Sequence, residues 1–232
     1  MIGLICAETA ELNEISKLMQ LKTKKITNHI NKIYGKISNQ KIVAAKCGVG
    51  KVSAAMCCEE MIITDNPDII INLGVCGAIK NGIHIGDLIL ADTVIQYDFD
   101  VSAFNHRKKG EISDLGIVNI PCSKKIVQKF LECNKKHPVA NLHIGCILTA
   151  DKFVNSNQIS HNLYNDFKGI ACEMEAGSIG QVCAMNNIEF AVLKAVSDNA
   201  NDNAPIDFSN FITQSSKQFA ALLKSFIESI QD

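Results

Sequence analysis

The sequence is poor in arginine. Arg107 is the single arginine among 23 basic residues, and the formal net charge of the 232-residue chain is −1. The one dense cationic run, Arg107-Lys108-Lys109, is more typical of a solvated loop than of a site that neutralises phosphate backbones. We therefore expect no nucleic-acid partner. The shortage of arginine also disfavours bidentate recognition of phosphate or carboxylate groups.

Signatures of metal sites, disulfides and membrane spans are missing as well. The ten cysteines include no C-x-x-C pair and lie mostly in apolar runs, which is typical of free thiols in a reducing compartment. The six histidines are scattered without metal-ligand spacing, so we expect neither a metal nor a cofactor. No run approaches the ~20 apolar residues of a membrane span, and the apolar opening Ile2–Ala7 is too short for a secretory signal. These absences predict a cytoplasmic protein that does not enter a membrane.

One glycine-rich segment matches a nucleotide-binding motif only in part. Gly48-Val49-Gly50-Lys51-Val52-Ser53 has Ser53 where a dinucleotide fingerprint requires its third glycine or alanine, and it lacks the spacing of a P-loop. This mismatch disfavours a nicotinamide oxidoreductase. Close approach of the backbone to a small ligand and a plain turn between a strand and a helix are two open interpretations of the segment. No G-x-S-x-G nucleophile elbow occurs in the sequence.

Apolar runs alternate with helical patterns along most of the chain. Lys32–Ser38 and Lys41–Cys47 flank Asn39-Gln40 like a β-hairpin, and Asp98–Leu115 has no clear period, which predicts a loop of unusual length. The alternation predicts an α/β fold, in which a mostly parallel sheet is covered on both faces, in one domain over residues 1–232. The other expected strands are 2–7, 68–75, 86–97 as one strand or two, 142–149, 169–172 and 190–196, and the expected helices are 9–19, 52–63, 123–134, 155–167, 178–185 and one from Asp207 onward.

Polar and small residues follow the predicted strands, where ligands bind in open α/β sheets. Several carboxylates with apolar companions suit the cleavage of a glycosidic bond, in which one acid protonates the leaving group and one carboxylate activates water. A third carboxylate can accept hydrogen bonds from two sugar hydroxyls. Alternation sends the carboxylates of Glu173 and Glu175 to the same side, so that one can bind sugar and the other a structural partner. In chain order the residues after the strands are Glu8 and Glu11, Gly48-Val49-Gly50, Gly74–Gly77, Asp151 and Phe153, Glu173-Met174-Glu175, and Ser197-Asp198.

Asp198 is the strongest candidate for the acid. The apolar strand Phe190–Val196 leads directly to Ser197-Asp198, and burial there raises the pKa of a carboxyl group, so that it keeps its proton near neutral pH. The alternative is that Ser197-Asp198 caps the next helix, but helical spacing resumes only near Asp207. Glu11 has an alternative of its own, as a solvated residue in the first turn of a helix.

Six segments together carry a resemblance to a known family. They are Glu11, Gly48–Val52, Gly74–Gly77, Phe153, Glu173–Ala176 and Ser197–Ala200. Their order and spacing resemble the nucleoside phosphorylase/nucleosidase superfamily over essentially the whole chain, and the Glu-Met-Glu-Ala and Ser-Asp-Asn-Ala segments make the resemblance specific. Within the superfamily, the chain looks like the bacterial enzymes of methionine salvage that hydrolyse 5′-methylthioadenosine and S-adenosylhomocysteine to adenine and the 5′-substituted ribose. The resemblance implies a three-layer α/β/α sandwich with a central mixed, mostly parallel sheet, and a homodimer.

The resemblance also implies a role for individual residues. Asp198 is expected to be the general acid that protonates purine N7, with Ser197 orienting it, and Glu11 is expected to activate the attacking water. The long loop near Phe104 is expected to reach across the dimer. The expected substrate contacts are Glu175 with the 2′ and 3′ hydroxyls, Met174 under the sugar, Phe153 stacked on adenine, the backbone of Val154 on the base edge, and Val49, Phe208 and the neighbouring subunit's Phe104 around the 5′ substituent, and Glu173 and Gly77 are also expected to bind the substrate.

Three residues depart from the family pattern. Glu8 stands where these nucleosidases usually carry methionine, Val75 replaces a serine, and Lys194 replaces an arginine. All three touch the nucleophile or the 5′ region, so the choice among methylthioadenosine, S-adenosylhomocysteine, 5′-deoxyadenosine and aminodeoxyfutalosine stays open. Phosphorylases of the superfamily hold phosphate with arginines, whereas Arg107 lies in the long loop; this favours water as the nucleophile, although lysine also binds phosphate. The alternatives are a phosphate-dependent phosphorylase and a non-catalytic nucleoside-binding protein.

Overall fold

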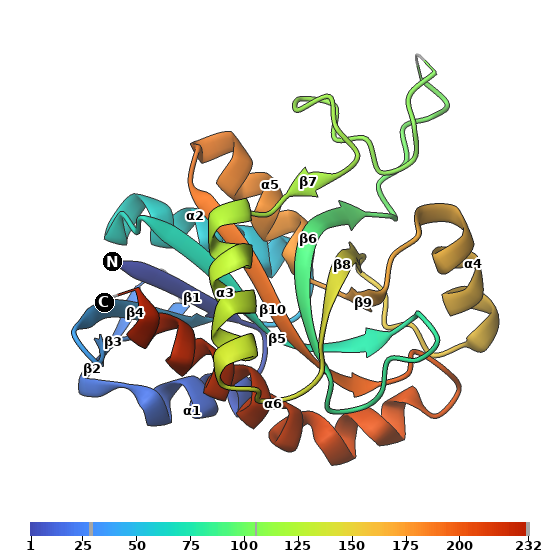
Figure 1. Cartoon of the computed structure of the whole chain (residues 1–232). Coiled ribbons are helices and arrows are strands. Elements are labelled where there is room, and N and C mark those ends of the chain that lie inside the picture. Colours follow the sequence, from blue (N-terminus) through green and yellow to red (C-terminus); the bar gives the residue numbers. More distant parts are fainter. Residues whose placement is uncertain (28–29, 105, 231–232) are drawn as a thin grey trace.

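The computed structural model describes residues 1–27, 30–104 and 106–230. A large mixed sheet forms its centre, with helices on both faces (Figure 1). The strands are β1 (Ile2–Cys6), β2 (Gln20–Thr27), β3 (Ile30–Ile37), β4 (Gln40–Lys46), β5 (Ile69–Ala78), β6 (Leu88–Gln96), β7 (Ile120–Pro121), β8 (Leu142–Thr149), β9 (Ala171–Glu173) and β10 (Glu189–Asp198). The helices are α1 (Thr9–Leu18), α2 (Lys51–Asp65), α3 (Lys124–Lys136), α4 (Asn157–Phe167), α5 (Ala176–Asn186) and α6 (Ala204–Ser229).

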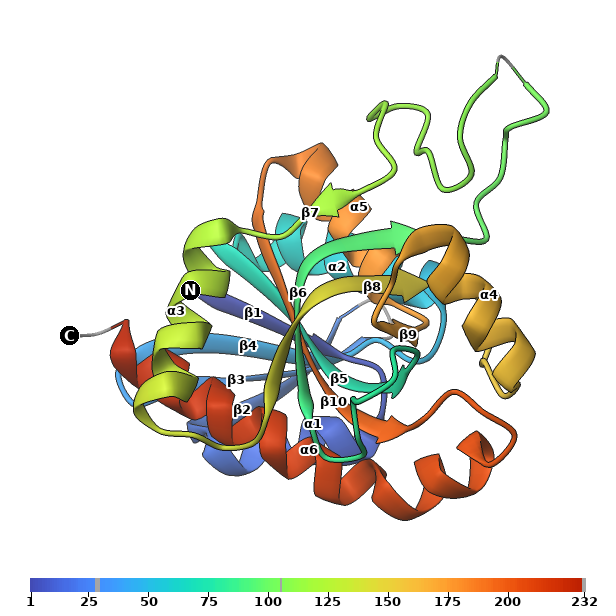
Figure 2. The same cartoon turned by 45° about the vertical axis from the view of Figure 1, so that its right-hand side comes forward.

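Strand β5 is the hub of the sheet. It pairs in parallel with β1 and β10 and antiparallel with β9. Because β10 also pairs with β6, and β6 connects through β8 to β9, the strands β5, β10, β6, β8 and β9 form a closed ring of pairings. Strands β1, β4, β3 and β2 extend the sheet outward from β5, and the fan of twisted strands is visible in Figure 2. The mixed sheet that the sequence predicts is confirmed.

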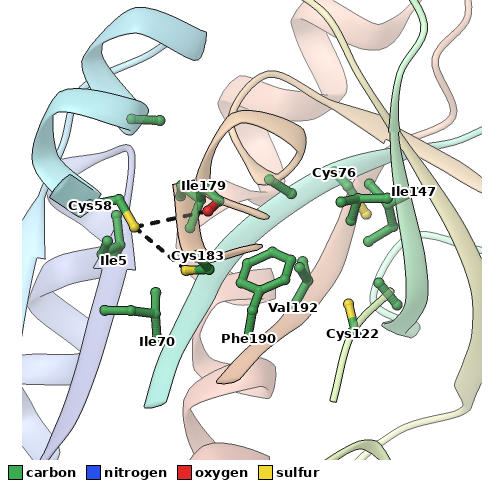
Figure 3. Packing of buried hydrophobic residues seen from close by; sticks show 14 of the residues in the cluster. Ile5, Cys58, Ile70, Cys76, Cys122, Ile147, Ile179, Cys183, Phe190 and Val192 are labelled. Atoms are coloured by element: carbon green, nitrogen blue, oxygen red, sulfur yellow. Dashed lines mark hydrogen bonds between the residues drawn. The ribbon is translucent and has the colours of Figure 1, made fainter. Parts of the chain in front are cut away.

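Two apolar cores lie on opposite faces of the sheet. Helices α1, α3 and α6 cover one face, where Phe130 of α3 stacks on Phe226 of α6 with 4.1 Å between ring centroids. Helices α2 and α5 cover the other face, where Sγ of Cys58 lies 3.6 Å from Sγ of Cys183 (Figure 3). All ten cysteines are free thiols. The expected three-layer α/β/α sandwich is confirmed, and none of the helices in the described ranges is long and apolar enough to cross a membrane.

Most predicted elements begin and end within a few residues of the observed ones, and the exceptions have identifiable causes. Strand β2 has no predicted counterpart, because it is an exposed edge strand that lacks an apolar alternation. The two-residue strand β7 is too short to leave a pattern. Helix α6 begins at Ala204, three residues before the predicted Asp207, with Pro205 in its first turn. Residues 86–97 hold a single strand, β6.

The segment between β6 and β7 is the long loop that the sequence predicts. In its described residues it contains an isolated β-bridge between Ile112 and Ile117 and no helix or longer strand. The loop projects away from the sheet and its helices in both views (Figures 1 and 2). Its first residues nevertheless remain close to the carboxyl end of β8, because the backbone N–H of Tyr97 donates to the carbonyl of Thr149 at 3.1 Å.

Candidate active site

A cavity of about 520 Å³ opens at the carboxyl ends of β1, β5, β9 and β10. Every site residue predicted from the sequence lines it except Phe104. Phe104 lies in the long loop with 71% of its surface exposed, so its role in a neighbouring subunit's site stays a prediction. The predicted residues in the cavity wall are Glu11, Val49, Gly77, Phe153, Val154, Glu173, Met174, Glu175, Ser197, Asp198 and Phe208.

Asp198 is the last residue of β10, and it lines the cavity with only 3% of the residue exposed. The hydroxyl of Ser197 donates to Oδ2 at 2.9 Å, and the backbone N–H of Ala200 donates to Oδ1 at 2.9 Å. Burial raises the pKa of Asp198, although these two hydrogen bonds act in the opposite direction. The helix-cap alternative does not hold, because the residue that precedes α6 as its N-cap is Asn203.

Glu11 is buried in the first turn of α1, so the solvated alternative does not hold for it either. Its Oε2 accepts hydrogen bonds from the backbone N–H groups of Ala7 at 2.9 Å and Glu8 at 2.8 Å, and its Oε1 accepts one from Val75 at 2.9 Å. Burial raises the pKa of Glu11, while the ammonium of Lys194 and the three N–H groups lower it. The carboxylate is therefore fixed in place between the end of β1 and the middle of β5.

Two glycines of β5 make room for these carboxylates. A Cβ atom added at Gly77 would lie 2.7 Å from Oδ1 of Asp198, and one added at Gly74 would lie 2.7 Å from Oε1 of Glu11. Gly74 also has a φ of +154°, which side chains rarely adopt. The two glycines are three residues apart on β5, so the two carboxyl groups contact the strand at different points along its length.

Glu173 has protein partners for both of its carboxylate oxygens. Oε1 accepts a hydrogen bond from the hydroxyl of Thr149 at 2.5 Å. Oε2 accepts hydrogen bonds from the backbone N–H groups of Glu175 at 3.0 Å and Ala176 at 2.8 Å, and it lies 3.0 Å from Nζ of Lys194. Glu173 thus binds the first turn of α5 to β8 and β10. Of the two neighbouring glutamates, Glu173 is the one with the structural partners.

Glu175 has more freedom to bind a ligand. Oε1 accepts a hydrogen bond from the backbone N–H of Gly50 at 3.0 Å, and Oε2 lies 4.0 Å from Nζ of Lys194. Burial and then the charge of Glu173 raise the pKa of Glu175 to about 7, against the lowering effects of Lys194 and of the Gly50 N–H. Burial lowers the pKa of Lys194, but Glu173, Glu175 and Glu11 together raise it above its usual range. Lys194 therefore remains a cation behind the cavity.

An aromatic wall faces these charges. The rings of Phe153 and Phe208 meet edge to face, with 5.9 Å between their centroids. Phe153 keeps 41% of its surface exposed, whereas Val154 beside it is buried. An exposed ring at the edge of a cavity is a surface on which a flat base can stack.

The cavity wall also contains six residues that the sequence did not single out as substrate contacts. Most are direct neighbours of predicted residues, so their position in the sequence indicated that they lie near the cavity. The sequence pattern did not indicate whether their side chains face it. They are Ala7, Cys76, Lys152, Cys172, Pro205 and Ser209. The departures Glu8 and Val75 also lie in the wall. Arg107 lies outside it and pairs with Glu111 at 3.2 Å in the long loop. Among the described residues, no group of three or more His, Cys, Asp or Glu side chains could hold a metal ion.

Comparisons with known proteins agree with this geometry. The sequence profile of the phosphorylase superfamily matches residues 1–228. The 5′-methylthioadenosine/S-adenosylhomocysteine nucleosidase of Staphylococcus haemolyticus is 31% identical over 98% of this chain and 99% of its own. The solved structure of the nucleosidase of that name from Streptococcus pneumoniae, with the transition-state inhibitor MT-ImmA, has a TM-score of 0.93 and 29% identity over 99% of both chains. A futalosine hydrolase mutant of Helicobacter pylori has a TM-score of 0.94 and 28% identity over 98% of both chains.

Proposed function

The chain belongs to the phosphorylase superfamily, and we propose that it is an N-glycosyl hydrolase that cleaves 5′-methylthioadenosine and S-adenosylhomocysteine into adenine and the 5′-substituted ribose. The observation that carries the proposal is the placement of two buried carboxyl groups, Asp198 and Glu11, on one cavity. The relatives from Staphylococcus haemolyticus and Haemophilus influenzae, which are 31% and 30% identical and are named for these two substrates, support the substrate class.

Asp198 is the proposed acid. Its raised pKa keeps the carboxyl group protonated at higher pH than an exposed aspartate, and the Ser197 hydroxyl and the Ala200 N–H fix its orientation. A proton delivered to N7 of adenine converts the base into a better leaving group, so that the bond to C1′ breaks with positive charge on the sugar. The edge-to-face pair of Phe153 and Phe208 provides the surface on which the base would stack.

Glu11 is the proposed base that activates water. Its carboxylate is fixed by three backbone N–H groups, two on Oε2 and one on Oε1, so Oε1 keeps a lone pair for a water molecule. Glu11 contacts β5 at Gly74 and Asp198 contacts it at Gly77, so the base and the acid reach the cavity from different points of the strand, as an acid and a base on opposite sides of a sugar require. Glu175, with one oxygen bound to Gly50, is the proposed acceptor for the two ribose hydroxyls.

Water is favoured over phosphate as the nucleophile. Glu8, Glu11 and Glu175 all line the cavity, and their carboxylates would repel a phosphate dianion. The single arginine lies in the long loop, and the ammonium of Lys194 is engaged by Glu173 and Glu175. Lys152 is the cation that lines the cavity, and it is exposed. An exposed lysine alone is a weak phosphate site beside three carboxylates.

The test is adenine release from 5′-methylthioadenosine by the purified chain, with and without phosphate. We expect equal rates and 5-methylthioribose as the sugar product. Release that requires phosphate and gives the sugar 1-phosphate would instead establish a phosphorylase of the same fold. Absence of turnover at concentrations that saturate binding would establish a nucleoside-binding protein.

The preferred 5′ substituent and the assembly are further parts of the proposal. Rates for methylthioadenosine, S-adenosylhomocysteine, 5′-deoxyadenosine and aminodeoxyfutalosine would rank the substrates, and the likeness to a futalosine hydrolase is the reason to include the last. We also propose a homodimer in which the exposed Phe104 of one subunit completes the 5′ pocket of the other. A Phe104→Ala variant that keeps the wild-type KM for methylthioadenosine would contradict that arrangement.

A further inference from the structure

A charged cluster joins three distant segments at the edge of the cavity. Nζ of Lys51 donates to Oδ1 of Asp98 at 2.5 Å, and the backbone N–H of Asp151 donates to Oδ2 of Asp98 at 3.0 Å. The backbone N–H of Lys51 donates to Oδ1 of Asp151 at 2.7 Å, which closes a cycle of three residues. Lys51 begins α2, Asp98 lies near the start of the long loop and Asp151 follows β8, so the cycle connects three segments that are far apart in the sequence.

The cycle provides a hydrogen-bond acceptor for the first turn of α2. The N-cap of this helix is Gly50, which has no side chain to accept a hydrogen bond from the first free N–H groups. Asp151 supplies the missing acceptor from 100 residues away, and its negative charge suits the positive end of the helix dipole. A Cβ atom at Gly50 would lie 3.0 Å from Oδ1 of Asp151, so the glycine permits this approach.

The same turn reaches the ligand-binding side of the cavity. While Lys51 directs its N–H to Asp151, the preceding N–H, that of Gly50, points to Oε1 of Glu175. The glycine-rich segment that the sequence singled out therefore directs two successive N–H groups to protein carboxylates. Asp151 belongs to the charged cycle and Glu175 to the cavity, so a shift of the turn changes both hydrogen bonds.

We propose that Lys51 and Asp98 are positioning residues, which hold the Gly50 N–H against Glu175 and the start of the Asp151–Val154 segment against the cavity. This inference rests on the proposed function, because it assigns to the cluster the placement of the sugar-binding carboxylate and of the segment that carries Phe153. It also connects the long loop to the site, since Asp98 lies in that loop two residues after the end of β6.

The hydrogen bond from Gly50 has an electrostatic consequence. It is one of the contacts that lower the pKa of Glu175, while burial raises that pKa. Loosening the turn should therefore raise the pKa of Glu175 further and shift the acid limb of kcat/KM to higher pH. A change that merely loosened the surface would not move this limb. The other groups that face Glu175 are Glu173 of β9, Lys194 of β10, Glu11 of α1 and Cys47 after β4.

The experiment compares Asp98→Ala with Asp100→Ala in the full chain. Asp100 is a matched control, because it lies in the same loop, accepts an N–H from Ser102 at 2.9 Å and sits 3.9 Å from Nζ of Lys109 on the surface. For Asp98→Ala we expect KM for methylthioadenosine to rise at least about tenfold, the factor for one lost charge-assisted hydrogen bond, with a smaller change in kcat. The acid limb of kcat/KM should move to higher pH. Asp100→Ala should change neither quantity.

A second variant keeps the test decisive if Asp98→Ala fails to fold. Lys51→Met removes the ammonium but keeps the N–H that Asp151 accepts, and it should raise KM in the same direction. The double variant should raise KM by less than the product of the two single increases, because both substitutions act through one cluster. Wild-type KM and an unshifted acid limb in either folded variant would overturn the inference while the proposed function stood. If the wild type released no adenine, the proposed function would fail, and the affinity of each variant for intact methylthioadenosine, measured by calorimetry, would test the cluster separately.

Discussion

Replacing Lys194 by methionine tests whether one buried ammonium holds the carboxylates of the site together. Nζ lies 3.0 Å from Oε2 of Glu173 and 4.0 Å from Oε2 of Glu175, in a side chain that is almost completely buried. Burial lowers the pKa of Lys194, but the carboxylates raise it further, so the group stays charged at neutral pH. Methionine has a similar length and no charge. Lys194→Met therefore removes the charge with little change in side-chain volume.

The size of the effect follows from the two distances. With an effective dielectric constant of about 20, unit charges 3.0 Å and 4.0 Å apart attract each other by roughly 5.5 and 4 kcal/mol. Desolvation of the three groups offsets much of this attraction, and loss of one partner from a buried pair typically lowers the free energy of unfolding by about 3–5 kcal/mol. We expect a loss in that range at about pH 8, which is a large share of the ~5–15 kcal/mol that stabilises a typical domain.

The loss should become smaller in acid. The pKa of Glu175 is raised to about 7, so stability falls as the pH rises from the pKa of a glutamate in the unfolded chain to that value, and above it the folded state bears the full penalty of the ionised carboxyl group. Lys194 lowers this pKa, so its removal raises the pKa and increases the penalty at about pH 8. At about pH 5.5, Glu175 carries its proton in both proteins, and the variant loses only the interactions of Lys194 with Glu173 and Glu11.

Guanidinium unfolding at both pH values and at one protein concentration measures the two losses. Lys224→Met is the matched control, because Nζ of Lys224 lies 3.8 Å from Oε1 of Glu228 on α6 and both side chains are about half exposed. Loss of that surface pair should change the free energy of unfolding by less than about 1 kcal/mol. The reasoning is refuted if Lys194→Met is as stable as Lys224→Met at about pH 8, or if its loss is the same at both pH values.

Three further outcomes concern the proposed chemistry. Asp198→Asn should lower kcat for adenine release by about 10²–10⁴-fold with little change in binding, because an amide cannot give the proton to N7; near-normal kcat would exclude the role. Gly77→Ala should lower kcat by at least about tenfold, since the added Cβ would lie 2.7 Å from Oδ1 of Asp198 and must displace it; an unchanged kcat would show that the carboxyl group can move freely. The kcat/KM of the wild type should fall below about pH 7 as Glu175 takes up a proton. Glu175→Gln should have a lower kcat/KM than the wild type and lack this acid limb; an acid limb that persists in the variant would assign it to another group.

Local sequence patterns were sufficient where the chemistry lies at the end of a strand. The apolar run to Val196 predicted a buried strand, and the structure buries Asp198 at its end. Glu11 was located by the same rule after β1, although its burial could not be predicted, because residues in the first turn of a helix are usually solvated. Gly74, which lies against that carboxylate, was the available signal.

Contacts between distant segments could not be predicted in this way. Gly50 and Glu175 are 125 residues apart in the chain, and nothing in the periodicity of either segment specifies their hydrogen bond. The same holds for the capping of α2 by Asp151, and for the pairing of β10 with β6 that closes the ring of strands. Strand β2 escaped prediction for another reason: an exposed edge strand buries neither face, so it leaves no alternation in the sequence.

The balance of buried charge connects the nucleophile to the leaving group. Glu11, Glu173 and Glu175 all act on the ammonium of Lys194, and when Glu175 is ionised their negative charge exceeds the one positive charge. In the proposed reaction the sugar becomes cationic only in the transition state, so this excess stabilises the transition state more than the bound nucleoside. A phosphate ion would bring further negative charge into the same space, whereas water brings none. The carboxylates that favour departure of the base thus also disfavour phosphorolysis, and added phosphate should leave the rate of adenine release unchanged.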